Sequence, residues 1–363
     1  MSFNTFILWI MALGSLIGGL DKLCGNRLGL GGEFEKGYEM MGPLTMGMAG
    51  VVCLMPLLQS GIRLTVSPLC AALHIDPAIF GAVLANDMGG YQLAMELAEN
   101  PLSGKLSGVL VSSTLGATLV FNIPVGLGII EEDKRPYFIK GLLIGLIAIP
   151  FGSFCGGLCA GFPVRLVWET IAPIAVIALL LAAGLRLIPR QITGGCLLFG
   201  KLVGSCGYVG LACAAFTSIT GVPLIPGMAP IEEAMKIVAE IAVVLGGVFP
   251  VLTILMRLLK RPLTFVGKWC GLGFTGVSAL ILALANSVSV FAIMKDMRGR
   301  EVIISMAWIV TASAVLGDHL GFTASVEPKM ILALVITKIS GGFLSILLAV
   351  YMTREDKEEG YGE

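Results

Sequence analysis

Asparagine amides occur at matching places in two long apolar stretches of the chain. The tripeptide Leu-Ala-Asn stands at 84–86 and again at 284–286, followed by Asp87 in the first copy and by Ser287 in the second. Such groups lack hydrogen-bond partners in hydrocarbon, so we expect them only where they line a polar site enclosed by protein. Paired polar interruptions in the two halves of a membrane protein indicate the binding site of a transporter.

The first copy has the composition of an interrupted helix. Asn86 and Asp87 are followed by a glycine pair and by Tyr91, which supply permissive torsions and a fixed negative charge. A carboxylate at mid-membrane costs at least ~2.5 kcal/mol on insertion scales, so it should be paired or face a wet cavity. The alternative is an Asn-Asp pair that caps a helix near the membrane interface. The second copy offers uncharged hydrogen-bonding groups, on Asn286, Ser287 and Ser289.

The densest polar cluster of the C-terminal half is the pair Asp318-His319, which stands between Gly317 and Gly321. Asp318 could receive a cationic substrate or a coupling proton, and His319 could bond a hydroxyl or relay that proton. The alternative places the pair at the outer mouth of its segment. Metal binding is not expected, because the only other histidine, His74, has no ligand spacing around it.

Two further polar residues lie inside apolar segments. Asn122 follows a hydroxyl-rich stretch at 112–118 and could line the same cavity from the other side. Equally, the hydroxyls of that stretch could bond only to their own helix. A buried Lys338 ammonium needs a partner, for which Asp318 or Asp87 is the natural candidate. The alternative is that Lys338 reaches to the membrane interface.

The elements that position these residues are membrane helices. Of the 363 residues 56% are hydrophobic and 13% charged, against roughly 25% charged in soluble domains. The apolar stretches leave no room for a soluble module, and the net charge of zero without a long basic run indicates no nucleic-acid partner. The stretch 195–202 fits a phosphate-binding loop except that Leu202 occupies the Ser/Thr position, so we expect no nucleotide and no cofactor.

Charged clusters divide the chain into about eleven apolar segments. A shorter stretch, 61–77, suits a half-helix or a re-entrant piece. The segments lie near 3–20, 38–59, 77–98, 104–130, 136–160, 166–187, 192–218, 232–258, 274–295, 301–324 and 330–352. The predicted fold is therefore an all-α polytopic membrane protein.

The basic residues constrain how the segments cross. They cluster after the first, fourth, sixth, eighth and ninth segments and at the C-terminus, and these clusters cannot all face the cytoplasm if every segment crosses. They can do so if each Leu-Ala-Asn tract changes parity once, through an extra crossing or a hairpin that fails to cross. The N-terminus is then outside and the C-terminus inside. The halves become inverted-topology repeats with discontinuous or re-entrant helices, at 1–190 with a linking helix and at 191–354, followed by a charged tail at 355–363.

Several motifs together resemble the EutH family of ethanolamine permeases. They are Gly-Gly-Glu-Phe-Glu-Lys-Gly-Tyr from residue 31, Asn-Asp-Met-Gly-Gly from 86, Phe-Asn-Ile-Pro-Val-Gly-Leu-Gly from 121, Leu-Ala-Asn from 284 and Leu-Gly-Asp-His-Leu-Gly-Phe from 316. The resemblance runs from the first segment to the last. It implies transport of a small amino alcohol across the bacterial cytoplasmic, or inner, membrane, either as a facilitator or linked to protons.

This implied substrate fits the candidate residues, although none is carried over from the family. Ethanolamine would need an acid for its ammonium, an amide or hydroxyl for its alcohol, and an aromatic face such as Tyr91, Phe291 or Phe322. A transporter of a different small amine remains an alternative. A membrane-embedded enzyme acting on amino-alcohol lipids would need an Asp-rich metal cluster, which the sequence lacks. A purely structural membrane scaffold would leave the paired intramembrane amides unexplained. Membrane lipid is the expected environment, and homo-oligomerisation stays open.

Overall fold

The computed structural model describes residues 3–65, 67–73, 75–84 and 90–354, and every regular element within them is helical. Eight helices in these ranges are long and apolar enough to cross a membrane, and they match eight of the eleven expected segments. The continuous ones include α1 (Phe3–Leu23), α10 (Arg135–Cys159), α11 (Val164–Leu187), α12 (Pro189–Thr220), α13 (Ile231–Trp269) and α18 (Ile331–Met352). The expected segments 77–98, 274–295 and 301–324 have other shapes.

Two further spans are built from shorter elements in sequence. One joins α2 (Gly31–Glu39), α3 (Met41–Leu44), the π-helix η1 (Thr45–Ala49) and α4 (Gly50–Thr65), after which α5 covers Ser67–Leu73. The other joins α8 (Pro101–Lys105), the π-helices η3 (Leu106–Gly116) and η4 (Thr118–Asn122), and α9 (Ile123–Ile129). A π-helix is wider than an α-helix and frequently occurs at functional sites, so η3 marks its span as a place of interest.

The segment expected at 77–98 is a helical hairpin. Its arms are α6 (Ala78–Leu84) and α7 (Gly90–Leu97), and Gly81 packs against the backbone of Ala94. The Asp76 carboxylate accepts hydrogen bonds from the Ala78 N–H at 2.9 Å and from the Asn100 N–H at 3.1 Å. Because one side chain binds both ends of the segment, the chain returns to where it started. We call this segment, 76–100, the first hairpin; the connection at 85–89 lies outside the described residues.

The segment expected at 274–295 also returns to its start. Its arms are α14 (Phe274–Ala283) and α15 (Val288–Ile293), followed by the 3-10 turn η6 (Met294–Asp296). The buried Glu301 carboxylate accepts from the Gly273 N–H at 2.7 Å and from the Arg298 N–H at 3.0 Å. One carboxylate therefore closes the base of this second hairpin, 273–298, as Asp76 closes the first.

The segment expected at 301–324 is an interrupted helix. Helix α16 (Gly299–Ala312) ends at Ser313, and α17 (Asp318–Val326) begins after five residues of irregular chain. Within this break Ala314 has φ of 57°, a left-handed conformation that costs a residue with a side chain roughly 1–2 kcal/mol. The short turn η7 (Pro328–Met330) then leads into α18.

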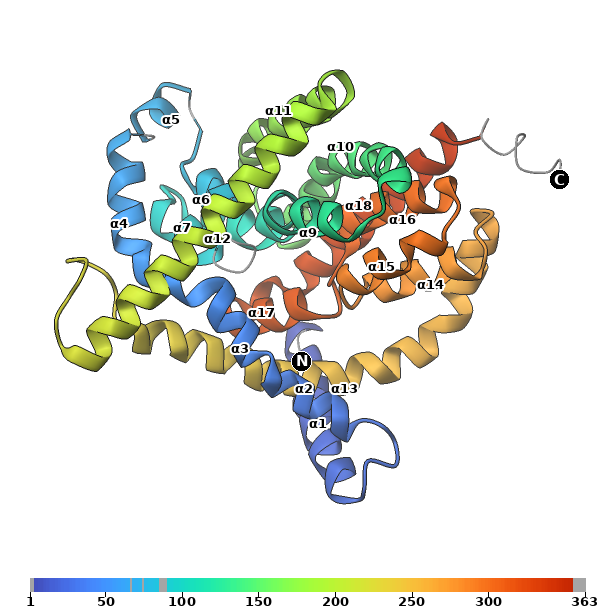
Figure 1. The fold of residues 1–363 in the computed structure, drawn as a ribbon, viewed down its shortest axis with the longest axis horizontal. Coiled ribbons are helices and arrows are strands. Elements are labelled where there is room, and N and C mark those ends of the chain that lie inside the picture. The colour runs from blue at the N-terminus through green and yellow to red at the C-terminus, as the bar shows by residue number, and fades with distance from the viewer. Residues whose placement is uncertain (1–2, 66, 74, 85–89, 355–363) are drawn as a thin grey trace.

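The buried apolar side chains form two large hydrophobic clusters and a small third one. The largest contains α6, the second hairpin, the 101–129 span, α10, α16 and α18, and the second gathers α1, the 41–53 region, α13 and part of α17. The third joins α4 to α7 through Val51, Met55, Ile62, Leu93 and Leu97. In Figure 1 α13 runs along the lower edge and α1 crosses it, whereas α10, α16 and α18 lie together above. The two large clusters meet at Tyr91, Leu316 and Val335, which pack against both.

Closely packed glycines set the crossings inside each cluster. A side chain on Gly14 of α1 would collide with the backbone of Gly247 on α13, and one on Gly50 of α4 would collide with Gly207 on α12. Gly152 of α10 likewise lies against the backbone of α18. Such close approach of helix backbones suits a membrane, where burial of apolar surface does not drive helices together.

Candidate functional site

The tip of the second hairpin crosses the break between α16 and α17. The Ala314 N–H donates to the Ala283 carbonyl at 2.8 Å, and the Leu316 N–H donates to the Leu284 carbonyl at 2.9 Å. Gly317 lies so close to the Ala285 carbonyl that any side chain there would overlap it. Two unwound stretches thus satisfy part of each other's backbone, as irregular chain at membrane depth requires. This crossing, residues 283–287 against 313–317, is the centre of the candidate site.

Lys338 of α18 joins this centre to the first half of the chain. Its side chain is fully buried, and its ammonium donates to the Ser113 carbonyl at 2.6 Å and to the Ser313 carbonyl at 2.9 Å. Ser113 lies in η3 and Ser313 is the residue at which α16 ends. The alternative in which Lys338 reaches to the membrane interface is therefore wrong, because the ammonium is held between two interrupted helices.

Asp318 and His319 form the first turn of α17. His319 is buried, Asp318 is partly buried, and an Asp318 carboxylate oxygen accepts from the His319 N–H at 3.1 Å. The partial positive charge of a helix N-terminus favours a carboxylate at this place. Phe322 lies one turn further along the same face, so an acid and an aromatic ring stand side by side at the start of α17.

Two predicted aromatic residues from different halves come together. The rings of Tyr91 on α7 and Phe322 on α17 meet edge to face, with their centroids 6.3 Å apart. The Tyr91 hydroxyl donates to Glu327 at 3.3 Å, and the Lys105 ammonium lies 2.8 Å from the same carboxylate oxygen. Sequence reasoning missed Glu327, although an acid directly before a proline, at the junction of two apolar segments, marked it as the end of a helix.

The predicted amides and hydroxyls have different outcomes. Asn286 is exposed and its side-chain oxygen accepts from the Ser289 N–H at 2.9 Å, so it caps α15, whereas Ser287 is buried. Asn122 is buried, and its amide nitrogen has no hydrogen-bond partner among the residues that the structure describes, which leaves it a donor for a ligand. The first-tract candidates, Asn86 and Asp87, lie outside the described residues.

Two of the hydroxyls before Asn122 bond to their own helix. The Ser113 and Thr114 hydroxyls both donate to the Leu110 carbonyl of their own helix, at 3.1 and 3.0 Å. One residue on this face instead reaches across: the Thr118 hydroxyl lies 3.5 Å from the Val310 carbonyl of α16. Gly126, two helical turns further on, meets the rings of Phe138 and Phe291. Asn122, which lies between Thr118 and Gly126, is therefore on the face that meets α15 and α16.

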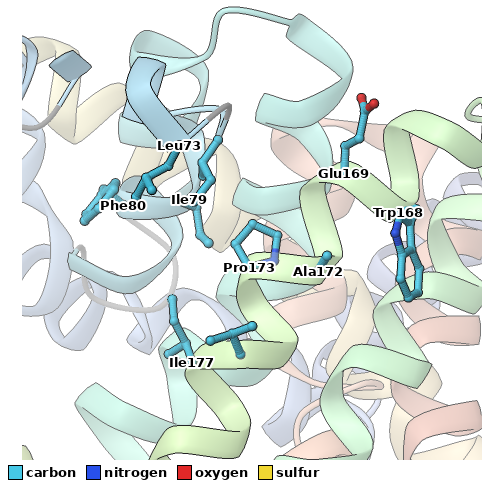
Figure 2. A pocket seen from close by; sticks show the side chains of 10 residues that line it. Leu73, Ile79, Phe80, Trp168, Glu169, Ala172, Pro173 and Ile177 are labelled. Atoms are coloured by element: carbon cyan, nitrogen blue, oxygen red, sulfur yellow. The ribbon is translucent and has the colours of Figure 1, made fainter. Parts of the chain in front are cut away.

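Two surface hollows are candidate entry points for a polar solute. One of about 530 Å³ lies between the 73–80 region and α11, and Figure 2 shows its apolar lining, with the Glu169 carboxylate pointing away from Leu73 and Phe80. Such a lining does not suit an ammonium. The other, of about 410 Å³, is lined by Glu33, Arg257 and neighbouring residues of α13, and by Ala285 at the hairpin tip. It connects charged side chains with the candidate site.

The chain is similar to a known family along its whole length. The family described as "Ethanolamine utilisation protein, EutH" matches residues 3–352. The "Probable ethanolamine permease EutH" of Listeria monocytogenes is 40% identical over 353 residues, which are 97% of this chain and 95% of the relative. The "Uncharacterized protein YxeR" of Bacillus subtilis is 38% identical (97% and 96%) and the "Probable ethanolamine permease EutH" of Salmonella typhimurium 34% identical (98% and 97%). No solved structure matches at a significant level.

Proposed function

Because the chain belongs to the EutH family, we propose that it carries ethanolamine across the bacterial cytoplasmic membrane by alternating access. The observation that carries this proposal is the crossing of the second hairpin tip with the α16–α17 break, where a buried ammonium and an acid lie in interrupted chain. Interrupted helices near the bilayer midplane form the substrate sites of secondary transporters. The permease names of the relatives agree with the prediction that the protein is not an enzyme.

The proposed topology has nine crossings and two hairpins that do not cross. Eight long helices and the interrupted helix α16–α17 make up the nine. If the N-terminus is outside, all of the basic clusters then face the cytoplasm, as the positive-inside rule requires. The parity changes inferred from sequence thus correspond to the two hairpins, of which the first opens to the outside and the second to the cytoplasm.

Contacts between distant loops agree with these two sides. On the proposed cytoplasmic side the Arg257 guanidinium donates to the Leu28 carbonyl at 2.9 Å. On the proposed outer side Lys105 pairs with Glu327, and the Asn4 amide donates to the Lys329 carbonyl at 2.7 Å. Each of these contacts joins loops that the topology assigns to the same side.

The same arrangement supports two inverted repeats, at 1–190 and 191–354, with α11 as the linking helix. Each repeat has two helices, a hairpin closed by a carboxylate, and two further spans. The crossing of α1 on α13 through Gly14 and Gly247 has its counterpart in the crossing of α12 on α4 through Gly207 and Gly50. Alternating access would then arise from movement between the two large hydrophobic clusters.

In the proposed binding mode Asp318 receives the substrate ammonium, beside the rings of Tyr91 and Phe322. An ammonium is attracted both to a carboxylate and to an aromatic face. The alcohol would bond to the unpartnered Asn122 amide or to Ser287. Asp87 and Asn86 remain proposed contributors from the first hairpin, and His319 could serve as the proton relay if transport is proton-linked.

Uptake of radiolabelled ethanolamine into liposomes containing the purified protein tests the proposal. Asp318→Asn keeps the shape of the side chain but removes its charge, so uptake should fall at least about tenfold, the equivalent of one lost charge-assisted hydrogen bond. The matched control is Asp133→Asn at an exposed acid, which should transport as the unmodified protein does.

Absence of uptake by the unmodified protein would refute the transport function, and unchanged uptake by Asp318→Asn would refute the assignment of the site. Competition by a panel of small amines and alcohols distinguishes ethanolamine from a different small amine. A strong inhibitor without an ammonium would contradict recognition by a carboxylate.

A further inference from the structure

We propose that the Lys338 ammonium is a built-in cation, tethered in the position that a coupling sodium ion would occupy, so that transport does not depend on sodium. This inference rests on the proposed transport function and adds to it the means of coupling. It starts from the place of the ammonium, between the carbonyls of Ser113 and Ser313.

The two carbonyls have the properties of a cation site. Ser313 is the C-cap residue directly after α16, at a helix end where carbonyls lack intrahelical partners and which carries partial negative charge. Ser113 belongs to η3, in which the π-helical turns re-aim backbone groups. In secondary transporters, carbonyls of unwound chain and of half-helix C-terminal ends coordinate sodium. Here the same kind of carbonyls are bonded to an ammonium, at 2.6 and 2.9 Å.

Burial explains why this cation stays in place. The Lys338 side chain is fully inaccessible, and withdrawing the ammonium would break at least its two charge-assisted hydrogen bonds to these carbonyls inside the protein. A sodium ion at such a site can leave on one side of the membrane and so transmit a gradient. The lysine is covalently part of the chain, so no sodium ion is taken up or released at this centre during a transport cycle.

The location also gives the cation a structural task that a sodium ion performs elsewhere. Ser113 lies in the first half of the chain and Ser313 beside the second hairpin tip, and Lys338 reaches both from α18. Removal of the ammonium should therefore leave a gap between two groups of acceptors that small cations can fill. That consequence separates a cation site from a lysine that merely packs.

The first experiment compares ethanolamine uptake by the unmodified protein in liposomes with sodium or with potassium as the only metal cation. We expect the two initial rates to lie within about twofold of each other. If sodium were coupled to transport, its removal should lower the rate by about fivefold or more, because coupling free energies between two sites are typically about 1–3 kcal/mol. A fall of more than about twofold without sodium would overturn the proposal. This measurement needs no variant, so it holds even if the variants below fail to fold.

The second experiment measures thermal unfolding of purified Lys338→Ala with sodium or methylammonium added. The shortened side chain opens the gap, and a cation at about ten times its Kd should raise Tm by about 2 °C. Lys338→Met, which refills the gap without charge, should not respond, nor should Lys329→Ala at an exposed lysine.

An absent response of Lys338→Ala, or an equal response of Lys338→Met, would overturn the proposal. Because unfolding is measured without transport, these outcomes remain informative if the protein moves no ethanolamine. That last result would refute the transport function while leaving the cation site to be judged by its own test.

Discussion

The Glu301 carboxylate holds the base of the second hairpin, and its removal should loosen that hairpin alone. Glu301 is buried and accepts from the N–H groups of Gly273 and Arg298 at 2.7 and 3.0 Å. In Glu301→Gln one oxygen is replaced by an amide nitrogen, so one of these two N–H groups loses its acceptor. The loss of a charge-assisted hydrogen bond costs roughly 1.5–3 kcal/mol, which corresponds to a roughly 10- to 150-fold increase in local opening.

Hydrogen–deuterium exchange with mass spectrometry measures this opening directly, because exchange of a protected amide follows the free energy of the local unfolding event. Peptides covering α14 and α15 should exchange faster by the factor above, while α10 and α18 stay unchanged. The matched control, Glu132→Gln, changes an acid whose side chain is 90% exposed in its pair with Arg135, and should leave the pattern intact. An acceleration below about threefold in α14 and α15, or an equal one across the whole protein, would refute the reasoning.

Two further predictions concern the crossing itself. Gly317→Ala should abolish most ethanolamine uptake, because the added methyl group overlaps the Ala285 carbonyl, whereas Gly42→Ala, where the space is open, should transport normally; equal uptake by the two variants would contradict the close approach. Ala314→Gly should leave Tm nearly unchanged, since relief of the left-handed backbone is offset by the greater freedom of the unfolded chain, while Ala314→Val should lower it; a Val variant as stable as Ala would show that this backbone is not strained.

Sequence reasoning predicted where the helices are interrupted, but not how the hairpins are closed. The glycines and polar residues at 284–287 and 317–321 mark helix breaks because they free or replace backbone hydrogen bonds, and such marks are local. The closure of the hairpins is not local. Asp76 and Glu301 each accept one hydrogen bond from an N–H group two or three residues away and another from an N–H group more than twenty residues away. Their role depends on where the chain returns, which no spacing records.

Lys338 shows the same limit in another form. A lysine inside an apolar segment predicts a partner, and sequence analysis looked for that partner among the carboxylates. The structure shows two bonds that this search did not consider, to the carbonyls of Ser113 and Ser313. Every residue carries a carbonyl, so only the folded backbone shows which ones have been released from their helices. The roles of Asn86 and Asp87 stay predictions.

The single ammonium at the centre has a consequence for the origin of the molecule. Helix α10, which corresponds to α18 in the proposed repeats, carries no charged side chain from 141 to 159. In an ancestor assembled from two identical subunits a central lysine would have been present twice, and the two ammonium groups would have repelled each other at the same pair of carbonyls. If the halves are repeats, as proposed, the central lysine marks a position at which they differ, and two halves of one chain can differ in this way.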